Sequence, residues 1–226
     1  MSSNNIALFD LDHTLIPIDS DHEWIEFLVR HNLAGDPEAV KRRNQEIYDK
    51  YTQGTLTIEE SAEFVLSFLA MHPPYDLARY HEQFMQEVIR PAIQAPAIEL
   101  VREHHAAGDL CCLVSATNTW VIAPIARAFG FEHCIGTTPE YVQGRFTGRF
   151  TGVASYQAGK ITRVEEWLKP MGLALKDFEK SYFYSDSMND LPLLEVVTHP
   201  VATNPQDSLR QIAQDKNWKV LDLFTQ

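Results

Sequence analysis

The amino-acid sequence predicts an α/β fold: a mainly parallel sheet with helices on both faces and a helical insertion after the first strand. Two observations lead to this prediction. From residue 91 onward, apolar strand-like runs alternate with amphipathic helical patterns, which is the order typical of a parallel sheet. Residues 17–90 contain helical patterns and no convincing strand. The chain of 226 residues is long enough for such a Rossmann-like core with an inserted helical bundle.

The first strand is the run IALF at residues 6–9, whose uninterrupted apolar character indicates burial on both faces. The insertion then shows helical spacing of apolar residues, interrupted by Gly, Asn and Pro. One of its helices has Thr57 and Glu60 placed as a capping box. We predict a core domain of residues 1–16 and 91–226 and a cap domain of residues 17–90. The helices expected in the cap are residues 20–33, 37–54, 57–72 and 75–91.

After the cap, each strand-like run is followed by a helical or turn pattern, and each stretch ends at Gly, Pro or a polar cluster. The expected strands lie within residues 110–117, 133–142, 181–186, 199–204 and 218–224. The expected helices are residues 96–108, 121–131, 161–172 and 191–197. Residues 144–152, GRFTGRFTG, predict a hairpin or turn because they combine glycine with aromatic residues.

Composition excludes several classes of function. The formal net charge of −12 argues against non-specific binding to nucleic acid or to an anionic membrane. No apolar run approaches 18 residues and no signal-peptide pattern is present, so we expect a cytoplasmic protein without a membrane partner. Three cysteines, two of them in the apolar run at residues 110–114, do not suggest a disulfide framework. The oligomeric state stays open.

Two aspartates directly follow the first strand, at Asp10 and Asp12. Residues two apart in an extended chain point the same way, so both carboxylates could face one spot. Bringing two like charges together costs energy unless a cation, a phosphate group or a shared proton lies between them. The pair therefore predicts a site for chemistry, the alternative being a strand-end turn or a helix cap.

Further polar groups end other strands of the predicted sheet. Ser115 ends the second strand, and Asp186 and Asp190 follow the strand at residues 181–185. Lys160 follows the glycine-rich segment. Because the carboxyl ends of parallel strands lie along one edge, these groups are expected to converge on a single crevice.

This set, in this order, resembles the haloacid dehalogenase-like hydrolases. DLDHT looks like their first motif, LVSAT like the second, Lys160 like the third and YSDSMND like the fourth. The helical insertion resembles the cap of the branch typified by phosphoserine phosphatase. The resemblance covers nearly the whole chain and implies a phosphatase that acts on a small phosphate ester with Mg²⁺ as its cofactor.

The resemblance implies a role for each matching residue. Asp10 would attack phosphorus and form an aspartyl-phosphate, while Asp12 would protonate the leaving oxygen and then activate water. The metal would be held by the Asp10 carboxylate, the Asp12 backbone carbonyl and Asp186. Asp190 would contact the metal, directly or through water, or would orient Lys160, which neutralises charge in the transition state. Phosphoryl and substrate contacts would come from Ser115, Ala116, Asn118 and Lys160. Asn189 is a polar neighbour that could also contact phosphate.

Structural alternatives accompany these roles. Ser115 could cap the helix that begins near Asn118, Lys160 could be a solvated surface lysine, and Asp186 with Asp190 could be an acidic helix start. His104 and His105 are expected to be exposed and not to bind metal. Two other functions remain open: phosphoryl transfer to an acceptor other than water, and a non-catalytic binding protein.

The expected substrate follows from a departure within the cap. The phosphoserine branch has a glutamate nine residues after the nucleophile and a cap arginine that grips the substrate carboxylate. Here the first position is Asp19, and Glu63 falls about where the arginine would lie. Asp19, Asp21 and Glu23 would form an acidic rim that, with Trp24 nearby, attracts an ammonium group. This favours an amino-alcohol phosphate of the histidinol or ethanolamine type over phosphoserine. Two alternatives stay open: a solvated acidic helix turn, and carboxylate recognition by Arg42 or Arg43.

Overall fold

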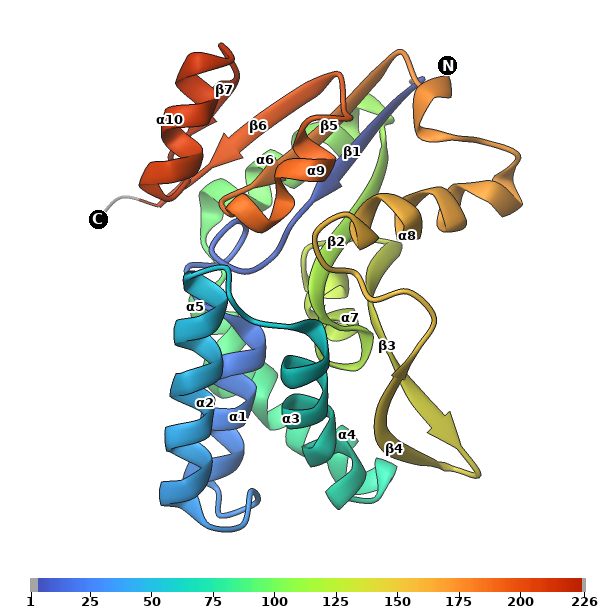
Figure 1. Ribbon diagram of the computed structural model, residues 1–226. Coiled ribbons are helices and arrows are strands. Elements are labelled where there is room, and N and C mark those ends of the chain that lie inside the picture. The colour runs from blue at the N-terminus through green and yellow to red at the C-terminus, as the bar shows by residue number, and fades with distance from the viewer. Residues whose placement is uncertain (1–3, 225–226) are drawn as a thin grey trace.

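The computed structural model describes residues 4–224, which form a central sheet with a helical lobe beyond the carboxyl ends of its central strands (Figure 1). The strands are β1 (Asn5–Phe9), β2 (Leu110–Asn118), β3 (His133–Val142), β4 (Arg145–Thr151), β5 (Lys180–Ser185), β6 (His199–Thr203) and β7 (Lys219–Leu221). Their order in the sheet is β4-β3-β2-β1-β5-β6-β7. All neighbouring pairs are parallel except β3 and β4, which form an antiparallel hairpin. The α/β fold class is confirmed.

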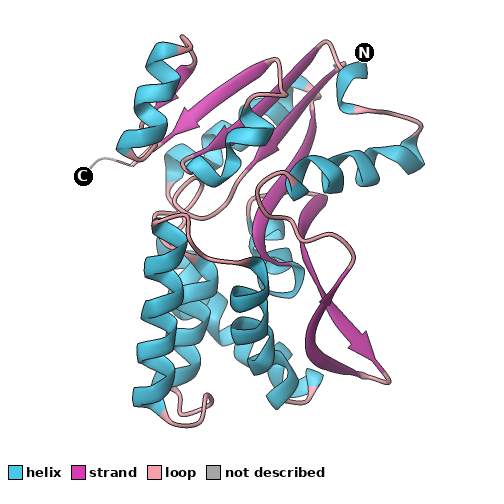
Figure 2. Cartoon of the chain, viewed as in Figure 1, coloured by secondary structure: helices cyan, strands magenta, loops and turns pink. Residues whose placement is uncertain are grey.

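Helices cover both faces of the sheet, and β1 shows why (Figure 2). Ala7 and Phe9 point into a core shared with α6 (Ala95–Ala107) and α7 (Thr119–Ala128). Ile6 and Leu8 point into the opposite core, shared with α8 (Gly159–Leu168), α9 (Leu191–Leu194) and α10 (Asp207–Asp215). A strand covered on both sides needs an uninterrupted apolar run, as residues 6–9 have. Helix α10 was not predicted from the sequence.

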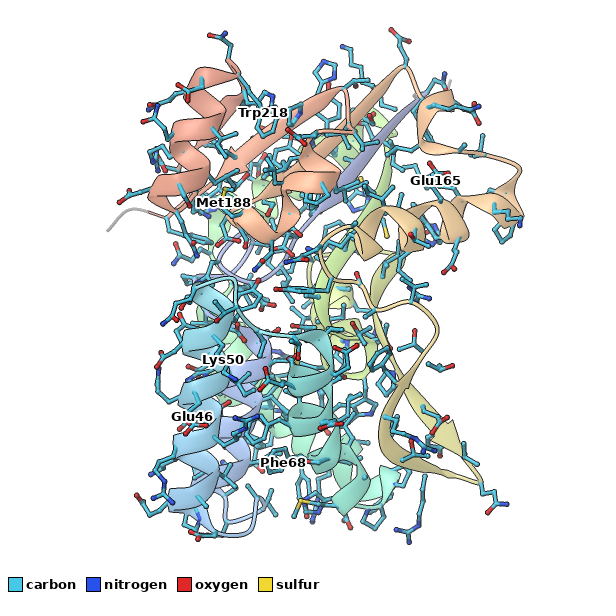
Figure 3. All side chains as sticks on the ribbon, viewed as in Figure 1. Glu46, Lys50, Phe68, Glu165, Met188 and Trp218 are labelled. Atoms are coloured by element: carbon cyan, nitrogen blue, oxygen red, sulfur yellow. The ribbon has the colours of Figure 1, made fainter. Side chains whose placement is uncertain are left out.

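The helical lobe, called the cap below, follows β1 and lies at the carboxyl ends of the central strands (Figure 1). It contains α1 (Ser20–Arg30), α2 (Pro37–Thr52), α3 (Ile58–Met71) and α4 (Pro74–Phe84), which continues through a π-helical turn (Met85–Ile89) into α5 (Arg90–Ala92). Figure 3 labels Glu46 and Lys50 on α2 and Phe68 on α3. Lys50 joins these two helices through an ion pair of 2.6 Å with Glu60.

The lobe also contacts a segment that the sequence analysis assigns to the core domain. The β3–β4 hairpin reaches α3, where Gly148 has a φ of +84°. A Cβ at that position would lie 3.6 Å from the Cβ of Ala70, so the strand backbone runs directly along the helix. Short one-turn helices complete the fold at Lys169–Met171, Leu175–Asp177 and Met188–Asp190. None of the helices in residues 4–224 is long and apolar enough to cross a membrane.

An aromatic cluster joins α1 and α4 of the lobe to α7 of the core. Trp24 is fully buried against Phe27, Phe84, His81 and Trp120. The Nε2 of His81 lies 2.8 Å from the carbonyl oxygen of Val121, so this nitrogen carries the proton of the neutral ring. Burial lowers the pKa of His81 from 6.5 to about 4. The native state therefore keeps this ring uncharged at neutral pH.

His81 gives a prediction for stability against pH. Its native pKa is lower than its unfolded pKa, so between pH 6.5 and 4 the unfolded chain binds a proton that the native protein does not. We expect the His81 contribution to be complete above pH 6.5 and to decline by about 3 kcal/mol as the pH falls to 4. Urea unfolding at several pH values measures it. His81→Gln, which can still donate to Val121, should show a shallower decline, and equal slopes in the two proteins would contradict the prediction.

Candidate active site

The predicted strand-end residues meet at the carboxyl edge of the sheet, where β1 lies between β2 and β5. Asp10 continues β1, since its N–H donates to the carbonyl oxygen of Tyr184 on β5 at 2.9 Å. Asp10, Asp12, Ser115, Asp186 and Asp190 are each at most 8% exposed. This burial excludes a solvated acidic cluster. The five side chains instead gather in one crevice at the point where the strand order reverses.

Thr14 links the two carboxylates expected to hold a metal. Its hydroxyl lies 3.1 Å from Asp10 Oδ2 and 3.2 Å from Asp186 Oδ1, and it accepts a hydrogen bond from the Asp186 N–H at 3.0 Å. Because a hydroxyl has one proton, it donates to one of these carboxylates at a time. Thr14 is part of the first motif, but no role was predicted for it from the sequence.

Lys160 is the cation of the site and is only 2% exposed. Its Nζ lies 2.8 Å from Asp10 Oδ1 and 2.7 Å from the Asp190 carboxylate. Asp190 also accepts a hydrogen bond of 2.7 Å from the Ser185 hydroxyl. Burial alone would lower the pKa of Lys160, but attraction by Asp10 and Asp190 outweighs it and holds this pKa above its ordinary value. The reading of Lys160 as a solvated lysine is therefore wrong.

Gly159 explains how Lys160 can lie so deep. A Cβ at Gly159 would collide with the carbonyl oxygen of Ala154, so only glycine allows this close approach of two backbone segments. The approach brings the first turn of α8 against the loop after β4. Lys160 then extends from that turn toward the end of β1.

The carboxylates of the crevice carry more negative charge than Lys160 offsets. Burial, followed by repulsion from the neighbouring acids, raises the pKa of Asp186 well above its usual range. Burial also raises the pKa of Asp10, even though Lys160 opposes the shift. A further cation beside Asp10 and Asp186 would relieve this repulsion. The donor set therefore suits a hard divalent ion.

Asp10 and Asp186 suit a magnesium ion better than Asp190 does. Within residues 4–224, no three acidic, histidine or cysteine side chains form a ready metal cluster. Mg²⁺ commonly takes one or two protein carboxylates and keeps several waters, which Asp10, Asp186 and a backbone carbonyl could satisfy. Asp190 is instead held by Lys160 and Ser185. These contacts hold Asp190 where it can orient Lys160, which is one of the roles expected for it.

Asp12 is held in place by the start of the cap and the end of β2. Its Oδ1 accepts a hydrogen bond of 2.7 Å from the Ser20 N–H, and its Oδ2 accepts one of 3.0 Å from the Thr117 hydroxyl. Burial, together with the negative charge of Asp19, raises the pKa of Asp12 to about 7. A carboxyl group with such a pKa can both give and take a proton near neutral pH.

The remaining second-motif residues are close to the crevice but differ in detail from the prediction. Ser115 Oγ accepts a hydrogen bond from the Thr117 N–H at 3.1 Å and lies 3.5 Å from Asp12 Oδ2. Ser115 does not cap α7, because Asn118 is the N-cap and accepts from the Val121 N–H at 3.1 Å. Ala116 lines the pocket described next. Asn118 donates to Asp21, so both functions of its amide are already engaged.

A pocket lies between the crevice and the cap. Its acidic lining residues are Asp12, Asp19 and Asp21, and its ring-bearing lining residues are His22, Tyr48, Tyr51 and Tyr156. Apolar and hydroxyl side chains from α3 close the opposite wall. Among the residues that the structure describes, no lysine or arginine lines this pocket. Its walls therefore suit a neutral or cationic group better than a carboxylate.

Several predicted cap contacts are wrong. Trp24 does not face the pocket, since its ring is fully buried in the aromatic cluster. Glu63 is exposed on α3, and Arg43 is engaged with Glu46 and Glu60. Arg42 lines a groove on the outer side of α1 and α2. Asp19 does line the pocket, although its Oδ1 caps α1 by accepting from the His22 N–H.

The expected exposure of the histidine pair on α6 is found for only one member. His105 is exposed, but His104 is largely covered, with an exposed side-chain fraction of 11%. Its two ring nitrogens lie 2.6 Å from Asp109 Oδ2 and 2.7 Å from the Tyr184 hydroxyl. These contacts fix α6 against the sheet, so His104 has a structural role.

Lys160→Ala should reduce both activity and stability. The variant leaves Asp10 and Asp190 buried without their cation, which we expect to destabilise the native state by about 3–5 kcal/mol at pH 7. Denaturant unfolding measures the loss, and Lys169→Ala, which removes an exposed lysine from the end of the same helix, is the matched control. Unchanged stability of Lys160→Ala would show that the ion pairs seen here do not stabilise the fold.

Comparison with known proteins identifies the family of this chain. The haloacid dehalogenase-like hydrolase family matches residues 7–195. A protein of Neisseria meningitidis named histidinol-phosphatase is 42% identical over 219 residues, which cover 96% of this chain and 98% of that protein. A Mycobacterium tuberculosis protein named phosphoserine phosphatase SerB1 is 35% identical over 157 residues, or 70% of this chain and 50% of its own length.

Solved structures agree on the fold. A crystal structure of a Bordetella pertussis protein of unknown function superposes with a TM-score of 0.94 at 56% identity, covering 99% of this chain and 100% of the other. A substrate-bound phosphoserine phosphatase superposes with a TM-score of 0.69 at 17% identity, covering 98% and 93% of the two chains. With the family match and the catalytic geometry together, the chain belongs to the haloacid dehalogenase-like hydrolases and is a phosphatase of that family.

Proposed function

We propose that this protein is a Mg²⁺-dependent phosphatase that hydrolyses an amino-alcohol phosphate, histidinol phosphate above all, through an aspartyl-phosphate on Asp10. The observation that carries the substrate assignment is the pocket beside Asp12, which is lined by three acids and, among the described residues, by no lysine or arginine. The near full-length relative named histidinol-phosphatase supports it. The proposal covers two steps of hydrolysis and the choice of leaving group.

In the first step, an Asp10 oxygen forms a bond to phosphorus as the ester P–O bond breaks. The departing alkoxide takes the proton of Asp12, whose raised pKa keeps part of the population protonated near neutral pH. Lys160, 2.8 Å from Asp10, offsets negative charge at the reacting group. Mg²⁺ bound by Asp10, Asp186 and the Asp12 carbonyl would offset charge between the carboxylate and the dianionic phosphate.

In the second step, water attacks phosphorus and gives a proton to Asp12. The bond between phosphorus and Asp10 breaks, inorganic phosphate leaves and Asp10 is restored. Ser115, Ala116 and nearby backbone N–H groups lie at the end of β2, where they could bind phosphoryl oxygens. Asp12 thus returns to its protonated form after each turnover.

Phosphoserine is the second candidate substrate, since relatives named phosphoserine phosphatase share the fold. Its carboxylate would meet Asp19 and Asp21 in the pocket, where no lysine or arginine of the described residues could pair with it, which makes it the poorer substrate. Transfer of the phosphoryl group to another alcohol is an alternative outcome of the second step. It would appear as a product yield that depends on the added acceptor.

Rates for a panel of phosphate esters, with Mg²⁺ and in a chelator, test the proposal. We expect kcat/KM to be highest for histidinol phosphate, lower for ethanolamine phosphate and lowest for phosphoserine, with activity lost in the chelator and restored by Mg²⁺. A preference for phosphoserine would overturn the substrate assignment. Full activity in the chelator would overturn the metal site.

A further inference from the structure

We propose that Asp21 is the residue that selects an ammonium group on the leaving alcohol, by forming an ion pair with it inside the cap pocket. This inference rests on the proposed phosphatase function and adds a specificity-determining residue to it. Asp21 lies in the first turn of α1, nine positions before the end of that helix. It faces the same pocket as Asp12, the proposed proton donor.

Asp21 is a carboxylate without a cation. Among the described residues, no lysine, arginine or histidine side chain forms an ion pair with Asp21 or Asp19. Asp21 accepts one hydrogen bond of 3.1 Å from the neutral amide of Asn118. A partly buried carboxylate with only neutral partners is costly, and a cation in the pocket would offset that cost.

The hydroxyl of Thr117 cannot fully compensate Asp21. It is within hydrogen-bond reach of Asp21 and also lies 3.0 Å from Asp12 Oδ2, but it has a single proton. When Thr117 donates to Asp12, Asp21 retains only the Asn118 amide. Burial, and then repulsion from Asp19 and Asp12, raises the pKa of Asp21 well above its usual range, in agreement with uncompensated negative charge.

A second observation points to a polar ligand at the same place. The Nδ1 of His22, the next residue of α1, is buried and has no hydrogen-bond partner in the described structure. The His22 ring lies 4.9 Å from the Tyr48 ring, centroid to centroid, and both residues line the pocket. A leaving group that pairs with Asp21 therefore lies in a pocket lined by the His22 and Tyr48 rings, the first of which carries the unpartnered nitrogen. Such a lining suits an amine attached to a flat heteroaromatic ring.

Asp21 is better placed for this contact than Asp19, the position expected from the family resemblance. Asp19 commits Oδ1 to the N–H of His22 at 2.8 Å as the cap of α1. Asp21 has no such backbone bond and is held from the side by Asn118 of the core. The alternative is that Asp21 only stabilises α1 by lying at the positive end of the helix dipole, as first-turn acids do.

Asp21→Asn separates these roles, because asparagine keeps the size of the side chain and removes its charge. Two substrate pairs are compared. The first is histidinol phosphate with its analogue lacking the amine, and the second is 2-aminoethyl phosphate, which is ethanolamine phosphate, with 2-hydroxyethyl phosphate. We expect the variant to lose about 10- to 100-fold in kcat/KM on each amine-bearing ester, mainly through KM, and to stay within about 2-fold on each amine-free ester.

Glu23→Gln is the matched control. Glu23 lies in the same first turn and carries the same charge, but it lines grooves on the outer surface together with Arg30. This variant should leave all four rates within about 2-fold of wild type. An equal loss in both control and test variants would assign the effect to the helix dipole and overturn the inference.

The two proposals fail in different ways. If the wild-type protein does not hydrolyse histidinol phosphate but prefers 2-aminoethyl over 2-hydroxyethyl phosphate, and Asp21→Asn removes that preference, the substrate identity is wrong and the role of Asp21 stands. If the wild-type protein shows no preference for the amine in either pair, or Asp21→Asn impairs both members of a pair equally, the inference about Asp21 is overturned.

Discussion

Asp10→Asn is expected to abolish turnover, with kcat reduced on the order of 10⁴-fold or more. The amide cannot form the acyl-phosphate, yet it fills the same space and its oxygen can still accept from Lys160, which is 2.8 Å from Asp10 in the wild-type protein. The loss therefore reflects chemistry and not collapse of the site. Acid-quenched incubation with labelled substrate should show phosphoryl transfer to the wild-type protein and none to the variant.

Asp207→Asn, which changes an exposed aspartate at the start of α10, is the control for loss of one negative charge. Its rate should match wild type. Hydrolysis near the wild-type rate by Asp10→Asn would remove Asp10 from the nucleophile role. Covalent labelling of Asp10→Asn at the wild-type level would have the same meaning.

Asp12→Asn is expected to lower kcat by about 10²- to 10⁴-fold, because both steps lose their proton carrier. Its structural bonds should survive: the amide oxygen can accept from the Ser20 N–H, and the Thr117 hydroxyl can turn to accept from the amide nitrogen. Mg²⁺ affinity should remain close to wild type, since only the backbone carbonyl of this residue is assigned to the metal. Titration with Mg²⁺ alongside the rate separates the two effects.

The leaving group provides an internal control for the Asp12 assignment. Nitrophenolate departs without a proton, whereas an alkoxide needs one, so formation of the aspartyl-phosphate by Asp12→Asn should be much less impaired with nitrophenyl phosphate than with an alkyl ester. Equal impairment with both esters would contradict the general-acid role. A fall in Mg²⁺ affinity that accounts for the whole loss of rate would contradict it as well.

The sequence was most informative where chemistry and backbone geometry act together. Asp10 and Asp186 each follow a buried apolar strand and Ser115 lies near the end of another, and parallel strands bring their carboxyl ends together whatever the loops do. Lys160 could be placed only by its order among the motifs, because a lysine after glycine has no pattern of its own. The close approach at Gly159 that buries it depends on Ala154, a contact that no local pattern records.

The cap was less accessible to sequence reasoning. An amphipathic pattern shows that one face of a helix is buried but does not say which neighbour covers it, and Trp24 therefore could equally line a pocket or pack on α7. Thr14 and Thr117 join the carboxylates through single hydroxyl groups, and hydroxyl residues are too common for such roles to stand out. Asp21 was visible only as one of several acids in a helix start.

The aromatic cluster around Trp24 also bears on how this protein unfolds. Trp24 and Phe84 of the cap belong to the same buried cluster as Val121 and Phe9 of the core, so the two predicted domains share one apolar interior. Excision of residues 17–90 would expose that interior on both fragments at once. We therefore expect the cap to be an insertion in chain order but not an independent folding unit, so that it melts together with the sheet in a single cooperative transition.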